Sequence, residues 1–302
     1  MTPRPDSHGR TDAGLVRKQN EDQFLISELS KWMEVRQTSL PIRDSTRLSS
    51  QRSGYLYLVA DGLGGAPAGD RASSIAVDSV LRYVLNVMPW FFRLEQREEA
   101  LELELKKVLE KCQVKIEADV AENPSRSGMG TTLTMAYVLW PELYVVHVGD
   151  ARAYLLRGEK LTQITQDHTL AGALGSKVAP AIRKVLWNVI GGGSSDLQPE
   201  VYHLTMEPGD LLLLATDGLT RHVTDPRIAQ LLGDAPTASA ACDQLISEAN
   251  KGGGRDNITT VVSRFKDPMP PSDSSSYQAM AAVSSETTQQ MPVPSAAPSP
   301  PG

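Results

Sequence analysis

The chain has 302 residues, of which 40% are hydrophobic and 22% charged, and its formal net charge is -6. This length allows one large core or two modest domains. The acidic balance argues against a nucleic-acid-binding protein or a protein of anionic membrane surfaces, both of which usually carry a basic patch, so we expect neither partner.

The cysteines and the composition of the N-terminal residues bear on the expected compartment. Cys112 and Cys242 are the only cysteines, so neither a disulfide framework nor a zinc site with CxxC spacing is expected. Free, buried thiols fit a reducing compartment, and we expect a cytoplasmic protein. The first ten residues lack the apolar core of a signal peptide, and the longest apolar run, 211–215, has only the length of a strand.

The predicted elements fall into clusters of strands and of helices. Short apolar runs between Gly, Pro or Asp predict strands, and apolar residues at i, i+3, i+4 predict helices. In chain order we expect a strand at 14–16, a loop at 30–52, a strand at 55–60, helices around 72–84 and 101–116, strands at 131–138, 143–148, 153–156, 160–164 and 210–215, a helix near 245–249 and a strand at 258–263.

The clustering of these elements predicts the fold class. The strands between 143 and 164 suggest an antiparallel meander. Because helices and strands do not alternate strictly, antiparallel sheets with outer helices, an α+β fold, are favoured over a doubly wound parallel sheet.

The composition changes sharply near residue 266. From there to residue 302 the chain is rich in Pro, Ser, Ala and Gln and poor in large apolar residues. Such a segment buries too little surface to offset its ordering entropy. We therefore expect one folded domain over 1–265 and a disordered Pro/Ser-rich tail over 266–302.

The motifs that carry chemistry are aspartates beside glycines. The sequence contains no GxSxG elbow, P-loop or HExxH motif. Instead, aspartates recur where apolar strands end, in the segments 20–22, 60–65, 148–150, 215–218 and 254–257. One Asp-Gly pair is most often a hairpin turn. Several carboxylates gathered in one place would repel one another, however, and oxygen ligands favour Mg²⁺ or Mn²⁺ over zinc.

The order of these segments resembles the PP2C-type (PPM) metal-dependent serine/threonine protein phosphatases, most closely their bacterial branch. The resemblance spans about residues 9–264 and rests on six motifs in order, which are RKQNED (17–22), VADGLGG (59–65), GMGTT (128–132), VGDAR (148–152), TDGL (216–219) and GRDNIT (254–259).

The resemblance implies an α-β-β-α sandwich with a cleft that holds two Mn²⁺ or Mg²⁺ ions. A hydroxide bridging the two ions would hydrolyse phosphoserine and phosphothreonine in proteins. Arg17 stands where the family binds phosphate, and Glu21 where a carboxylate holds metal-bound water. The implied metal ligands are Asp22, Asp61, Gly62 through its carbonyl oxygen, Asp217 and Asp256.

The sequence departs from the family near the cleft. Leu63 stands where animal members carry a histidine that is proposed to protonate the leaving group; His147 and His168 are candidates for that role only by residue type. Many relatives hold a third metal with Asp150 and a second aspartate. Arg221 stands in place of that second aspartate here, so we expect no well-occupied third ion at Asp150. Ala151 replaces the usual serine, and the flap segment, about 169–190, looks short.

Alternatives to a general phosphatase remain open from sequence alone. A catalytically silent PPM-fold binding module would be expected to lose metal carboxylates, but all four aspartates are retained. A phosphatase dedicated to one regulator phosphoserine in a signalling cascade would differ in substrate and not in chemistry. As partners we expect phosphorylated proteins, targets of a cognate Ser/Thr kinase, and we expect a monomer.

Overall fold

The computed structural model describes residues 4–30, 32–40, 47–49, 53–65, 68–86, 98–175, 178–193 and 196–266. The chain divides into two units, Met1–Pro268 and Met269–Gly302, and all described residues belong to the first. Apart from Lys266, the predicted tail lies outside the described residues, so both the tail and the domain boundary at 265 stay predictions.

The larger of the described sheets has seven strands in antiparallel pairings. Its order is β11-β6-β5-β7-β8-β12, and β2 also pairs with β5. Its strands are β2 (Asp22–Leu29), β5 (Gly54–Leu63), β6 (Gly130–Thr131), β7 (Leu133–Leu139), β8 (Glu142–Val148), β11 (Ile190–Gly191) and β12 (Glu200–Thr205).

The second described sheet has five strands in the order β1-β14-β13-β9-β10, again all antiparallel. Its strands are β1 (Asp6–Asp12), β9 (Arg152–Arg157), β10 (Lys160–Gln163), β13 (Leu211–Ala215) and β14 (Ile258–Arg264). A separate hairpin joins β3 (Trp32–Glu34) to β4 (Arg47–Ser49). The predicted loop at 30–52 therefore contains a small pair of strands.

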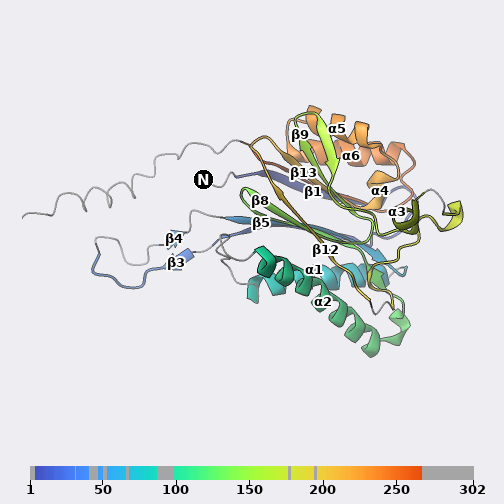
Figure 1. The fold of residues 1–302 in the computed structure, drawn as a ribbon, viewed down its shortest axis with the longest axis horizontal. Coiled ribbons are helices and arrows are strands. Elements are labelled where there is room, and N and C mark those ends of the chain that lie inside the picture. Colours follow the sequence, from blue (N-terminus) through green and yellow to red (C-terminus); the bar gives the residue numbers. More distant parts are fainter. Residues whose placement is uncertain are drawn as a thin grey trace, which may run out of the picture. The chain divides into compact units, whose positions relative to one another are not determined.

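Helices cover the outer faces of both sheets (Figure 1). The helices α1 and α2 pack on the seven-stranded sheet, and α5 and α6 pack on the five-stranded one. The described helices are α1 (Ala68–Asn86), α2 (Glu98–Glu122), α3 (Leu170–Leu174), α4 (Asp217–Thr220), α5 (Asp225–Asp234) and α6 (Ala238–Lys251), with short 3₁₀ turns η1 (Pro124–Arg126) and η3 (Pro180–Ile182). None of them is long and apolar enough to cross a membrane.

Alternation of side chains along the strands creates three hydrophobic layers. In β13, Leu211 and Leu213 pack toward α5 and α6, whereas Leu212 and Leu214 pack between the sheets. A strand buried on both faces reads as a continuous apolar run, because successive side chains point to opposite faces. The three layers confirm the predicted α-β-β-α sandwich.

The predicted strand at 14–16 is wrong. These residues form a turn in which Gly14 has a φ of 76°, and Leu15 and Val16 are largely exposed. A Cβ at Gly14 would lie 2.2 Å from the carbonyl oxygen of Asp256, so only glycine lets the turn approach so closely. The strand that sequence reasoning missed, β1, is polar and forms by pairing with β14.

The predicted meander is also wrong in part. The hairpin of β9 and β10 is present, but β8 and β9 belong to different sheets. Gly149, with a φ of 111°, lies at the point where the chain leaves one sheet for the other. The segment 149–151 is therefore a crossing between layers, which places Asp150 at the edge of the sandwich.

Candidate metal centre

The candidate site begins where β2 and β5 lie side by side. Asp22 stands directly opposite Asp61 in the antiparallel register. Asp61 is held through its backbone: its N–H donates to Thr132 Oγ1 (3.1 Å), and its carbonyl oxygen accepts from Thr131 Oγ1 (2.9 Å). The backbone bonds leave the Asp61 carboxylate available to the site.

Hydroxyl groups from the other sheet hold the Asp22 carboxylate. Thr216 Oγ1 and Thr259 Oγ1 donate to Asp22 Oδ2 at 2.8 and 2.7 Å. Sequence reasoning missed both threonines, although each lies in a motif that it used. The second oxygen, Oδ1 of Asp22, is buried and receives no hydrogen bond from the described residues. One oxygen of this carboxylate is thus held by hydrogen bonds, and the other is left without a hydrogen-bond donor.

Two glycines let the chain approach itself closely beside these aspartates. A Cβ at Gly62 would lie 2.2 Å from the carbonyl oxygen of Gly69, at the start of α1, and a Cβ at Gly69 would lie 2.9 Å from Cδ of Glu21. No side chain fits at either position without movement of the backbone. Glu21 is 8% exposed, so the start of α1 and the segment before β2 enclose its carboxyl group.

Asn257 fixes the segment that carries Arg17 and Glu21. Its Oδ1 accepts from the Glu21 N–H (2.9 Å), and its Nδ2 donates to the carbonyl oxygens of Ala13 (3.1 Å) and Gln19 (2.9 Å). Sequence reasoning quoted Asn257 in the GRDNIT motif but gave it no role. Its amide positions the whole segment on β14.

Arg17 lies against Asp256. Its Nε and Nη2 are 2.9 and 3.0 Å from Oδ1 and Oδ2 of that carboxylate. This bidentate pair joins the predicted phosphate-binding arginine to a predicted metal ligand, while half of the Arg17 side chain stays exposed. An arginine that is half exposed at the edge of the site can also meet a phosphate.

Arg221 brings the remaining carboxylates together. Its guanidinium pairs with Asp217, lies 3.1 Å from Oδ2 of Asp256 and lies 3.9 Å from Oδ2 of Asp150. Asp150, Asp217 and Asp256 therefore share the same cation. Oδ1 of Asp217, like that of Asp22, is buried and receives no hydrogen bond from the described residues.

The electrostatics of the site favour added positive charge. Burial raises the pKa of Asp22 to about 6, against the effect of the Thr259 and Thr216 hydrogen bonds. Burial, reinforced by Asp22, Asp150 and Asp256, raises the pKa of Asp61 well above its usual value. Burial also raises the pKa of the Asp150 and Glu21 carboxyls. Cations bound among these groups would stabilise their ionised forms.

The carboxylate oxygens of the site are ligands that hard divalent cations prefer, although the side chains do not surround a position for such an ion. The carboxylates supply only oxygen ligands, and two of them present buried oxygens without donors. Across the parts of the chain that the structure describes, no group of three or more His, Cys, Asp or Glu side chains stands ready to hold a metal ion. The guanidinium of Arg221 lies between Asp217 and Asp256.

Both histidines considered as proton donors are structural. His147 is fully buried, with Nδ1 2.9 Å from Thr134 Oγ1 and Nε2 3.0 Å from the Gln166 carbonyl oxygen. His168 is 1% exposed, and its Nδ1 accepts from the Gly149 N–H at 3.1 Å. Burial lowers the pKa of both, that of His147 to about 3. Neutral, buried rings of this kind hold the backbone beside Asp150.

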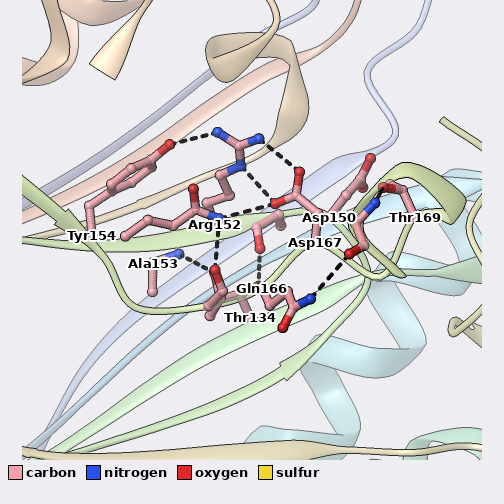
Figure 2. A network of polar contacts seen from close by, with 12 residues as sticks. Thr134, Asp150, Arg152, Ala153, Tyr154, Gln166, Asp167 and Thr169 are labelled. Atoms are coloured by element: carbon pink, nitrogen blue, oxygen red, sulfur yellow. Dashed lines mark hydrogen bonds and ion pairs between the residues drawn. The ribbon is translucent and has the colours of Figure 1, made fainter. Parts of the chain in front are cut away.

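A polar network fastens the start of the flap to the strand that follows Asp150. The Arg152 guanidinium donates to both carboxylate oxygens of Asp167 at 2.7 Å and to the Tyr154 hydroxyl at 2.9 Å. Figure 2 shows this guanidinium between Tyr154 and Asp167, with Thr169 beyond them. The predicted flap, 169–190, thus begins at a rigid point next to the site and contains α3 and η3.

A family model described as protein phosphatase 2C matches residues 34–251, which is well over half of the chain. The chain belongs to the protein phosphatase 2C family. This confirms the family predicted from the sequence, together with the expected class of enzyme and its sandwich fold.

Relatives of this protein phosphatase 2C chain include phosphatases of bacteria. The serine/threonine phosphatase stp of Listeria monocytogenes is 30% identical over 261 residues, which cover 84% of this chain and 93% of the relative. The protein phosphatase PhpP of Streptococcus pneumoniae is 31% identical over 253 residues, which cover 78% of this chain and 96% of that relative.

A solved structure shares the fold of the whole domain. The serine/threonine phosphatase PstP of Mycobacterium tuberculosis superposes with a TM-score of 0.68 and 29% identity, over 87% of this chain and 99% of that one. A structure of the PstP catalytic domain in complex with 2 manganese ions superposes with a TM-score of 0.67. These matches are consistent with the oxygen-rich site described above.

Proposed function

We propose that this protein phosphatase 2C chain removes phosphate from phosphoserine and phosphothreonine in proteins, with two Mn²⁺ or Mg²⁺ ions as cofactors. The observation that carries the proposal is that Asp22 and Asp61 stand opposite each other on β2 and β5. In addition, Asp22 and Asp217 each have a buried carboxylate oxygen without a hydrogen-bond partner among the described residues. Such oxygens are costly to bury unless they bind something.

The ion-binding residues proposed from this arrangement are Asp22, Asp61, Asp217 and Asp256 through their carboxylates and Gly62 through its carbonyl oxygen. When bound, two divalent cations supply a water-derived nucleophile at neutral pH and neutralise phosphate charge. Glu21, enclosed beside Gly62 and Gly69, is proposed to accept a hydrogen bond from water in the site and so to orient it.

Arg17 is proposed to bind the phosphoryl group of the substrate. Its planar guanidinium holds two oxygens at once, as it holds both oxygens of Asp256 in the described structure. The charge on the transferring phosphoryl group is spread over its outer oxygens, and a positioned guanidinium stabilises it in the transition state. Since half of its side chain is exposed, Arg17 can turn from Asp256 to an incoming phosphate.

The proposal extends to the partners of the chain. Its substrates would be phosphoproteins made by a Ser/Thr kinase, and it would act as a monomer in the cytoplasm. Relatives named as serine/threonine phosphatases support the substrate class. The two free, buried cysteines support a reducing compartment.

Release of phosphate from a phosphothreonine peptide tests the proposed function. We expect turnover with Mn²⁺, none after treatment with EDTA, and recovery when Mn²⁺ is returned. A phosphotyrosine peptide of the same sequence is the control for substrate class. A chain that binds Mn²⁺ without releasing phosphate from any phosphopeptide would instead be a silent binding module.

A further inference from the structure

Arg221 places a positive charge among the carboxylates that are proposed to bind metal ions. It directly follows the short helix α4, and its backbone N–H donates to the carbonyl oxygen of Asp217 at 2.9 Å. This turn directs the side chain back over the carboxylate of Asp217. With 31% of its side chain exposed, Arg221 is partly shielded and has room to move.

The guanidinium groups use the oxygens that a metal ion would need. Oδ1 of Asp256 lies 2.9 Å from Arg17 Nε, and Oδ2 lies 3.0 Å from Arg17 Nη2 and 3.1 Å from Arg221 Nη1. The carboxylate of Asp217 shares one oxygen with Arg221 and keeps the other free. For Asp256 to ligate an ion, at least one guanidinium has to withdraw.

Asp150 offers Arg221 a second position. Its Oδ2 lies 3.9 Å from Nη2 of Arg221, and this contact is the one ion pair of Asp150 among the described residues. Asp150 is 8% exposed, so its charge needs a partner. Arg152, two residues further along, is already committed to Asp167. A small rotation of the Arg221 side chain would exchange Asp256 for Asp150.

We propose that Arg221 is a tethered counter-cation that competes with divalent ions for Asp217 and Asp256 and moves onto Asp150 when the ions bind. In the metal-free chain it holds the carboxylates together. In the loaded chain it neutralises Asp150, which is thereby closed to a further ion. The inference rests on the proposed function, because it assumes that divalent ions bind at these aspartates.

Calorimetric titration with Mn²⁺ tests the competition. We expect Arg221→Gln to bind Mn²⁺ at least about tenfold more tightly than the wild type, because a charged hydrogen bond to a carboxylate no longer has to be broken. Arg221→Lys, which keeps the charge but not the planar fork, should fall between the two. The matched control is Arg227→Gln, which should leave the affinity unchanged. Arg227 on α5 pairs with Glu248 on α6 at 2.9 Å.

The melting temperature in EDTA gives a second readout. Without metal, Arg221→Gln should melt below the wild type, because the carboxylates lose their counter-charge. Affinity and metal-free stability thus move in opposite directions. A purely structural role for Arg221 would instead lower the stability without raising the affinity, and that result would overturn the proposal.

Asp150→Asn tests the second position of Arg221. It should weaken Mn²⁺ binding in the wild-type background, since Arg221 then has no partner to move to, and should weaken it much less in the Arg221→Gln background. An equal loss in both backgrounds would show that Asp150 acts on the ions directly, and the proposed transfer would be wrong. If the wild type binds no Mn²⁺ at all, the proposed function fails first, so the two failures are distinguishable.

Discussion

Asp22, the first residue of β2, faces Asp61, two residues before the end of β5, in the antiparallel register. Like charges directly opposite each other destabilise a strand pair. Burial raises the pKa of both carboxyls, and the charge of Asp22 raises the pKa of Asp61 further. The pair is therefore an unfavourable arrangement for folding alone and a favourable one for binding cations.

Removal of one carboxylate from this pair should abolish catalysis and leave the fold intact. We expect Asp61→Asn, and likewise Asp217→Asn, to lose phosphatase activity and Mn²⁺ affinity while keeping a wild-type circular dichroism spectrum. The control is Asp78→Asn, which removes an exposed carboxylate that pairs with Arg82 on α1. Near-normal turnover by both site variants at saturating Mn²⁺ would rule out the proposed ligands.

Replacement of Arg17 separates phosphate binding from metal binding. We expect Arg17→Ala to keep its Mn²⁺ stoichiometry and to lose at least about tenfold in kcat/KM, because a charged hydrogen bond is worth about 1.5–3 kcal/mol. Arg17→Lys should recover only part of this loss, since an ammonium cannot hold two phosphate oxygens in a planar fork. Unchanged kcat/KM in the alanine variant would remove Arg17 from the site.

The C-terminal segment should be dispensable for the folded domain. We expect a chain that ends before Pro268 to keep the melting temperature of the full chain and its turnover of a small phosphorylated substrate, because the removed residues include few that form a core. A melting temperature lower by several degrees would show that the segment packs on the domain.

His147 should make the stability of the fold depend on pH. Burial lowers its pKa to about 3, below the value of about 6.5 for an unfolded histidine. Between these values the unfolded chain binds the extra proton, so stability falls as the pH is lowered from about 6.5, by at most about 1.4 kcal/mol per pH unit from this group.

Denaturant titrations of the wild type and of His147→Asn at several pH values between 7.5 and 4.5 test this assignment. The substitution should cost stability at every pH, because the ring fills a buried space, but the slope against pH should become shallower. Parallel slopes for the two proteins would show that His147 does not titrate on unfolding.

The sequence predicts the parts of the site that depend on local patterns. An apolar run followed by Asp-Gly indicates a carboxylate where a strand ends. Asp217 lies just beyond β13, at the start of α4, whereas Asp61 lies inside β5, which continues to Leu63. Apolar residues spaced at i, i+3 and i+4 predict the helices α1 and α2, and these residues are buried as expected.

What the sequence could not predict depends on contacts between distant segments. The strand β1 has no apolar alternation and exists because β14 lies beside it. Thr216 and Thr259 look like ordinary strand residues until the second sheet brings them to Asp22. At Gly149 the sequence indicates a hairpin where the structure has a crossing between sheets, because a glycine in a short turn looks the same in both cases.

The bonds from Thr216 and Thr259 to Asp22 also affect the order in which the chain can mature. The Asp22 carboxylate belongs to the seven-stranded sheet. Of its two hydrogen-bond donors, Thr259 lies in β14 of the other sheet and Thr216 directly follows β13 of that sheet. A partly folded intermediate with a single sheet would therefore lack part of the ligand set. Ions would then be captured only by the finished sandwich, and by mass action they would hold its halves together. Loading with metal becomes the last step of assembly, and loss of metal the first step toward its reversal.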